Sequence, residues 1–183
     1  GVREASVLLL ESGPRVLAGY HAGTARRVEA NARARGIEIR LDARVAEARA
    51  SELVLADGQV VPFDALVWVT GAASLPLFHG AGVALDERGF VRVRRTPQLL
   101  EHEDIFAVGD CASLEGATDL AKAGVYAVRE GPVLTANLRA RLMGQPLEPY
   151  RPQRDFLSLL NLGDGRAIGS KWGVSFEGRW VFR

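Results

Sequence analysis

Two acidic residues each follow a short apolar run, a pattern that can deliver a carboxylate to a binding site. Glu11 follows Ala5–Leu10, and Asp110 follows Ile105–Val108 and Gly109. Short apolar runs bounded by turn residues fit buried strands, and open α/β sheets bind ligands at the carboxyl ends of their strands. A carboxylate accepts hydrogen bonds from ligand hydroxyls, and a glycine lets backbone approach closely. Taken alone, each acid can equally be an ordinary strand-end residue that caps the next turn or helix.

Glu11 has a specific chemical interpretation. In a dinucleotide-binding βαβ unit, an acid at this place accepts hydrogen bonds from the adenosine ribose and repels a 2′-phosphate. That motif needs a glycine-rich loop about 20 residues earlier, and only ten residues precede Glu11. Either the chain starts in the middle of a nucleotide-binding fold, or Glu11 is a structural acid. Arg15 favours the opposite specificity, because a guanidinium can bind a 2′-phosphate.

The other residues that could carry chemistry are few. The single cysteine, Cys111, excludes internal disulfides and any Cys-x-x-Cys pair within this chain, and we expect it to fill a small buried space. No metal site is predicted, and no side chain stands out as a general acid or base. The three histidines are His21, His79 and His102.

The composition is that of an ordinary globular protein. Of 183 residues, 48% are apolar and 25% are charged. The net charge of +1 argues against a nucleic-acid interface, which needs a basic face. The sequence contains no signal peptide and no apolar run long enough to span a membrane. We therefore expect a cytoplasmic protein without a transmembrane segment.

The first elements predict a βαβ unit. An apolar strand at 5–11 is followed by a helix from Thr24, its expected N-cap, to about Arg35. A second strand follows at 37–41. Because a helix connects them, we expect the two strands to be parallel.

An antiparallel meander comes next. Alternating runs lie at 44–48, 51–55 and 59–61, and Asp57-Gly58 between the last two is a strong hairpin signal. Another apolar run, Ala65–Gly71, predicts a buried strand that returns to the first sheet.

The second half of the chain predicts strands at 90–93 and 105–110, then a helix over about 119–143. Pro132 lies inside that helix and should kink it. The tail predicts a hairpin around 163–165 and a further strand or two. These last strands carry the aromatic residues Trp172, Phe176, Trp180 and Phe182.

Three motifs, in this order and spacing, resemble the FAD-dependent pyridine nucleotide–disulfide oxidoreductases. They are Leu66–Gly71, Ile105–Asp110 preceded by Thr96, and Lys122–Gly131. The resemblance covers nearly all of the chain up to about Leu142. It implies an α/β fold that is part of a two-dinucleotide-binding-domain flavoprotein, with a Rossmann-like βαβ unit and an antiparallel meander.

The resemblance also implies roles for single residues. Gly71 marks the return from the NAD(P)H domain to the FAD domain, and Asp110 after Gly109 binds the ribityl hydroxyls of the flavin. The N-terminus of the following helix points at the flavin pyrimidine, where its positive end stabilises negative charge. The residues at that helix start are Ala123, Gly124 and Val125.

Two further assignments stay open. Lys122 could lie near the flavin edge and favour the reduced anion, or it is a solvated first-turn side chain. The tail aromatics could line a quinone-facing or membrane-facing surface, or they form the core of a hairpin.

Within the superfamily, the chain most resembles the NADH dehydrogenase-like branch, which includes flavoproteins fused to selenide water dikinase. The segments that carry this resemblance are Lys122–Arg129 and Gln145–Leu157. No histidine follows His102, which argues against the dithiol exchange of the glutathione reductase branch. The implied domains are the C-terminal part of an NAD(P)H domain (1–71), the C-terminal part of an FAD domain (72–145) and a small β-rich cap (146–183).

The implied function is that of the C-terminal portion of an FAD-dependent oxidoreductase. Electrons would pass from NAD(P)H, with NADH preferred because of Glu11, through the flavin to a quinone or another small acceptor. We expect the missing N-terminal half of the same protein to be required, the protein to lie in the cytoplasm or peripheral to the membrane, and oligomers to be allowed. The alternatives are a regulatory or partner-binding module without cofactors, and a redox domain that serves selenium metabolism.

Overall fold

The structure, a computed structural model, describes residues 5–153 and 155–182 and divides into two compact units. Unit 1 combines the chain up to Trp68 with the segment from Asp155 onward, and unit 2 is the part that begins at Val69 between them. The α/β class predicted from the sequence is confirmed.

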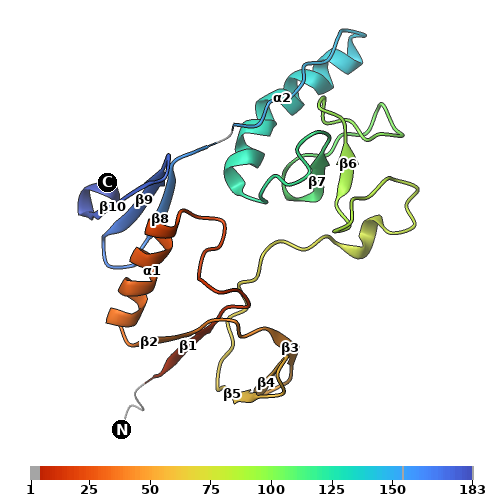
Figure 1. Ribbon diagram of the computed structural model, residues 1–183. Coiled ribbons are helices and arrows are strands. Elements are labelled where there is room, and N and C mark those ends of the chain that lie inside the picture. Colours follow the sequence, from red (N-terminus) through yellow and green to blue (C-terminus); the bar gives the residue numbers. More distant parts are fainter. Residues whose placement is uncertain (1–4, 154, 183) are drawn as a thin grey trace. The chain divides into compact units, whose positions relative to one another are not determined.

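Unit 1 opens with the predicted βαβ unit (Figure 1). Strand β1 (Val7–Leu10) and strand β2 (Ile37–Arg40) are parallel and in register, with Val7 opposite Ile37, and helix α1 (Ala22–Ala34) connects them. Apolar residues on the helix-facing side form a small core. Its buried members are Val16, Ala25 and Ile39.

The N-cap of α1 differs from the prediction. His21 caps the helix, with Nδ1 accepting a hydrogen bond from Gly23 N at 3.3 Å. Thr24 instead lies in the first turn with none of its surface exposed, and its Oγ1 donates to Ser170 Oγ at 2.8 Å. Packing of the tail against the helix therefore determines what Thr24 does, and local sequence does not show that contact.

The predicted meander is confirmed. Strands β3 (Val45–Ala48), β4 (Glu52–Leu55) and β5 (Val60–Pro62) form an antiparallel sheet. Gly58 adopts a left-handed φ of 87° in the turn between β4 and β5, and Asp57 Oδ1 accepts a backbone N–H two residues on. The Asp-Gly pair thus supplies the chemistry that the turn requires.

The prediction of a buried strand at Ala65–Gly71 is wrong. This segment has no strand structure, and Val67 and Val69 expose 79% and 82% of their surface. A strand buried on both faces needs hydrogen-bonded neighbours, and among residues 5–153 and 155–182 no strand pairs with it.

The tail forms a second antiparallel sheet in unit 1. Strands β8 (Ser158–Asn161), β9 (Ala167–Lys171) and β10 (Val174–Gly178) are adjacent in that order, and the turn between β8 and β9 confirms the predicted hairpin. The chain then ends in the short helix α3 (Arg179–Phe182) rather than in another strand. Strands β9 and β10 contact α1 within unit 1. The segment 146–183, predicted as a cap, begins in unit 2 and continues in unit 1.

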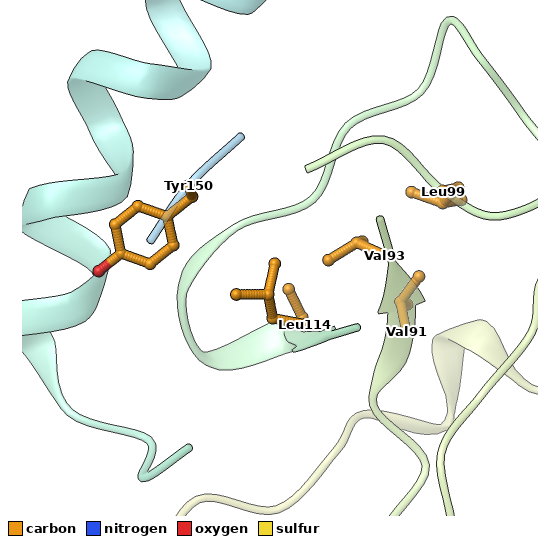
Figure 2. Packing of buried hydrophobic residues seen from close by; sticks show 6 residues of the cluster. Val91, Val93, Leu99, Leu114 and Tyr150 are labelled. Atoms are coloured by element: carbon orange, nitrogen blue, oxygen red, sulfur yellow. The ribbon is translucent and has the colours of Figure 1, made fainter. Parts of the chain in front are cut away.

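Unit 2 is built around a two-stranded parallel sheet and a long helix. Strand β6 (Val91–Val93) pairs with β7 (Ala112–Leu114), and helix α2 (Gly124–Leu142) contains Pro132. A short 3-10 helix, η1 (Pro76–Phe78), precedes them. The core of this unit, shown in Figure 2, consists of Val91, Val93, Leu99, Ala112, Leu114 and Tyr150.

The prediction of a buried strand at Ile105–Asp110 is also wrong. Ile105 is 49% exposed, and Phe106 makes only an isolated bridge to Gln98. The regular pairing comes just later, in β7, after the one-turn 3-10 helix η2 (Gly109–Cys111). Helix α2 likewise begins at Gly124 rather than at about residue 119.

Candidate functional site

The turn that carries Asp110 depends on its glycine. Gly109 begins η2 with a left-handed φ of 71°, and a Cβ added there would lie 3.3 Å from the Ala127 Cβ. Both facts exclude a larger residue without strain. The Asp110 side chain that follows is exposed to solvent.

The start of α2 lacks a side-chain cap. Its N-cap, Ala123, is extended and has no side-chain oxygen, and the first turn holds no acidic residue. The N–H groups of Gly124 and Val125 lie in that first turn, where no carbonyl within the helix can accept them. This end of α2 can therefore stabilise an acceptor-rich or negatively charged group.

A small cavity of about 10 Å³ joins these two features and has room for one water molecule. Three of the predicted flavin-binding residues, Gly109, Asp110 and Ala123, line it. Gly71, Gly124 and Val125 do not line it, and Glu11 belongs to unit 1. The remaining lining residues are Ala112, Leu114, Ala117, Leu120, Ala121, Lys122, Tyr126 and Glu130.

Lys122 is half-buried in this wall. Its Nζ donates to the Ala112 carbonyl and lies 4.3 Å from the centre of the Phe90 ring. Burial lowers the pKa of the ammonium, and the nearby charge of Arg88 lowers it further. The side chain is thus partly buried and held in place beside the cavity.

Glu130 is a functional candidate that we did not single out from the sequence. It is only 5% exposed, and its Oε2 accepts a hydrogen bond from Gly109 N at 2.5 Å. Burial raises the pKa of its carboxyl group. The signal for it was periodicity: Tyr126, Glu130 and Asn137 follow one another at helical spacing and form the buried face of α2.

Asn137 anchors the chain that returns along α2. None of its surface is exposed, its Nδ2 donates to the Glu148 carbonyl at 2.8 Å, and its Oδ1 accepts from Glu148 N at 2.7 Å. Tyr150, two residues later, is buried with its hydroxyl directed toward α2 (Figure 2). Burial raises the pKa of Tyr150, and the nearby Glu130 carboxylate adds to that shift.

In unit 1, Glu11 stands directly after β1, at the carboxyl end of the parallel pair. Its Oε1 accepts a hydrogen bond from Gly13 N at 2.9 Å, so its own turn orients the carboxylate. Arg15 directs its guanidinium to the backbone, with Nη2 donating to the Ala18 and Tyr20 carbonyls at 2.6 and 2.9 Å. These bonds leave Arg15 poorly suited to hold a 2′-phosphate.

The tail aromatics are only partly a hairpin core. Phe176 stacks on Trp180 with 5.2 Å between ring centres, whereas Trp172 is 76% exposed and has Lys171 Nζ 4.0 Å from its ring centre. Trp180 and Phe182 expose 67% and 52% of their surface.

The described part of the chain contains neither a cluster of metal ligands nor a membrane-spanning helix. Across residues 5–153 and 155–182, no three His, Cys, Asp or Glu side chains lie close enough together to hold a metal ion. The helices within the same residues are all too short or too polar to cross a bilayer.

The known proteins that resemble this chain include a dehydrogenase, a reductase and an oxidoreductase. A probable NADH dehydrogenase of Dictyostelium discoideum is 26% identical over 165 residues, covering 87% of this chain and 35% of the relative. A demethylphylloquinone reductase of Synechocystis sp. is 25% identical over 177 residues, covering 94% and 44%. The solved sulfide:quinone oxidoreductase of Aquifex aeolicus superposes with a TM-score of 0.74 at 17% identity, covering 96% and 46%, and so has the same fold.

The chain spans less than half the length of each of these relatives. The family model described as pyridine nucleotide-disulphide oxidoreductase matches residues 2–131, which is most of the sequence. The resemblance predicted from the three motifs is confirmed, and the chain belongs to the pyridine nucleotide-disulphide oxidoreductase family.

Proposed function

We propose that the protein binds FAD and NADH and takes part in passing electrons from NADH to a quinone or another small acceptor. The observation that carries the proposal is the meeting, at one cavity, of an exposed carboxylate and an uncapped helix start. Relatives described as an NADH dehydrogenase and as a demethylphylloquinone reductase support the choice of donor and acceptor.

The residues at the cavity and at the start of α2 suit groups of a flavin nucleotide. An acceptor-only carboxylate at Asp110 suits the ribityl hydroxyls, and the first-turn N–H groups of Gly124 and Val125 suit the pyrimidine oxygens and nitrogen. When bound, FAD supplies the redox chemistry. The positive end of α2 then stabilises negative charge that builds on the pyrimidine side, and Lys122 adds a nearby cation.

Glu11 supports NADH as the donor. Its carboxylate is oriented by Gly13 N at the carboxyl end of β1, where a ribose would bind. A negative charge at that place accepts hydrogen bonds from the two ribose hydroxyls and repels a 2′-phosphate. Arg15 could otherwise bind a 2′-phosphate, but its guanidinium donates hydrogen bonds to backbone carbonyls.

The test uses the protein as its gene encodes it. The purified protein should show flavin absorbance near 450 nm that NADH bleaches under anaerobic conditions and that a short-chain quinone restores. Protein that carries no flavin, and takes none up from excess FAD, would refute the proposal and favour a cofactor-free partner-binding module. Bleaching without restoration by any quinone would refute the acceptor alone.

We further propose that the tail binds the surface of a membrane. Trp172, Trp180 and Phe182 are exposed aromatics in one small sheet-and-helix element, with the cations Lys171 and Arg179 among them. Exposed aromatic rings next to basic side chains suit the interface between lipid headgroups and acyl chains. Such a location would bring the protein to a quinone dissolved in the bilayer.

Vesicle sedimentation tests this location. The wild-type protein should sediment with vesicles that contain anionic lipid, and a Trp172→Ser, Trp180→Ser double variant should stay in the supernatant. Val67→Ser, an exposed apolar residue outside the tail, is the matched control. Equal sedimentation of all three proteins would contradict the proposal.

A further inference from the structure

Glu130 is a charged side chain at a place where burial is costly. It lies on the inner face of α2 with 5% of its surface exposed. Desolvation disfavours the ionised form of such a group, so a buried carboxylate is retained where partners stabilise it. Burial accordingly raises the pKa of Glu130, while the hydrogen bond from Gly109 and the charge of Lys122 oppose that rise.

The Glu130 carboxylate is bonded to the turn that carries Asp110. Oε2 of Glu130 accepts the Gly109 N–H at 2.5 Å. Ala127, one turn earlier on the same helix, would lie only 3.3 Å from a Cβ placed at Gly109, so the helix passes close to this glycine. Helix α2 therefore approaches Gly109 closely and holds it by a charge-assisted hydrogen bond.

The same helix also supplies the other half of the candidate flavin site. Its N-cap, Ala123, lines the same cavity as Asp110 and Glu130, and the uncapped first turn at Gly124 and Val125 follows directly. The distance from the Asp110 carboxylate to those N–H groups is thus set by how firmly the turn is fixed to α2. Precise placement of such groups matters because small displacements weaken hydrogen bonds to a ligand.

We propose that Glu130 is a positioning residue for the flavin, whose carboxylate fixes the Gly109–Asp110 turn against α2 through its hydrogen bond to Gly109 N. The inference rests on the flavin site proposed above and names a residue that acts on that site through Gly109.

The groups that face Glu130 come from three elements. Asp110 faces it from η2, Lys122 from the loop before α2, and Tyr150 from the segment after α2. Lys122 is the cation among these three, and the raised pKa of Tyr150 keeps its hydroxyl neutral. Protonation of Glu130 therefore replaces a charge-assisted bond to Gly109 by a neutral one, which is about half as strong.

Three variants of the protein as its gene encodes it separate the possibilities. Glu130→Ala removes the acceptor, and Glu130→Gln keeps an acceptor oxygen without the charge. Asn137→Ala is the matched control, because Asn137 is a buried polar residue on the same helix face that holds Glu148 instead of Gly109.

The readouts are the dissociation constant for FAD and the deuterium exchange of the peptide containing Gly109 in flavin-free protein. Glu130→Ala should weaken FAD binding by about tenfold or more and speed exchange at Gly109. Glu130→Gln should retain FAD at neutral pH. As the pH falls through the raised pKa of Glu130, this variant should lose less affinity than the wild type, because it has no carboxylate to protonate. Asn137→Ala should leave the exchange at Gly109 unchanged.

The two failures are distinguishable. Wild-type protein that binds no FAD would refute the proposed function. If wild-type protein binds FAD, and Glu130→Ala binds it with the same affinity and the same exchange at Gly109, the positioning role alone is refuted. A loss of affinity in Asn137→Ala equal to that in Glu130→Ala, with unchanged exchange at Gly109 in both, would also overturn it.

Discussion

Two turns in this protein deliver a carboxylate in contrasting ways. Glu11 in unit 1 follows a regular parallel strand, and its carboxylate is oriented by Gly13, two residues later. Asp110 in unit 2 follows no regular strand, and its turn is held by Glu130, a residue on a helix that begins well after it. The Glu11 carboxylate is thus oriented within its own turn, whereas the turn of Asp110 is bonded to a side chain of a later helix.

The difference has a chemical consequence. Because the Glu11 carboxylate already accepts a backbone N–H, it is pre-oriented but has less capacity for further donors. The Asp110 side chain is exposed, and its position depends on the preceding backbone at Gly109, which is bonded to Glu130. Substitutions in the two turns should therefore affect different properties of the protein.

Gly109→Ala should have the largest effect. A residue with a side chain in the left-handed region costs about 1–3 kcal/mol, and the added Cβ would also press on Ala127. We expect lower thermal stability together with loss of bound flavin. Gly131→Ala in α2 is the control: nothing lies within 4 Å of its added Cβ, and removing a helical glycine should stabilise by about 0.5–1 kcal/mol. Equal melting temperatures for the two variants would contradict the assigned role of the turn.

Asp110→Ala should weaken FAD binding by roughly tenfold to a hundredfold, which corresponds to losing a hydrogen bond to a charged acceptor. Because the side chain is exposed, the free energy of unfolding should change by no more than about 0.5 kcal/mol. Asp110→Asn keeps one acceptor oxygen, so its affinity for FAD should lie between those of the wild type and Asp110→Ala. Unchanged flavin occupancy in Asp110→Ala would refute the ribityl role.

Glu11→Ala should narrow the preference for NADH over NADPH by about tenfold, because repulsion of the 2′-phosphate is lost together with hydrogen bonds to the ribose. The measurement is the ratio of kcat/KM for the two donors. Glu11→Gln can still accept from Gly13 N and isolates the contribution of charge. An unaltered ratio in both variants would return Glu11 to a purely structural role.

Arg15→Ala should leave that ratio unchanged and lower the free energy of unfolding by about 1 kcal/mol, because its side chain bonds to two backbone carbonyls. A rise in KM for NADPH with no change for NADH would show that Arg15 binds the 2′-phosphate after all, and it would remove the contrast between the two turns.

The smallest effect concerns the pH dependence of stability. Burial raises the pKa of Glu130, so the folded protein binds a proton here more tightly than the unfolded chain does. Its contribution to stability is therefore greatest below the ordinary carboxyl pKa and declines as pH rises through the raised value. Glu130→Gln removes this decline. The melting temperature of the variant minus that of the wild type should therefore increase from acidic to neutral pH, by about 2–4 °C for each kcal/mol that the wild type loses. A constant difference across that range would contradict the sign.

The sequence predicted best those elements whose contacts are local. The βαβ unit, the Asp57-Gly58 hairpin and the tail hairpin all follow from periodicity and turn chemistry within about 35 residues. The apolar runs at 65–71 and 105–110 failed as strands because a buried strand is made by its neighbours, and periodicity does not reveal whether neighbours are present.

The candidate site was predicted in part for a similar reason. Motif order and spacing drew attention to Gly109, Asp110 and the start of α2, and three of the predicted residues line one cavity. Glu130 escaped notice because a glutamate in a helix is ordinarily solvated, and only its place on the buried face distinguishes it. The assignment of each residue to a cofactor stays a prediction.

Cys111 offers an experimental handle on this turn. It is the single cysteine of the sequence and ends η2, half-buried, with Sγ 3.3 Å from the Val108 carbonyl. The rate at which Cys111 is alkylated should therefore report opening of the turn. Alkylation should be slow while Glu130 binds Gly109 N and faster when that bond is lost. Measuring this rate would report on the contact between Gly109 and Glu130 without any cofactor or substrate.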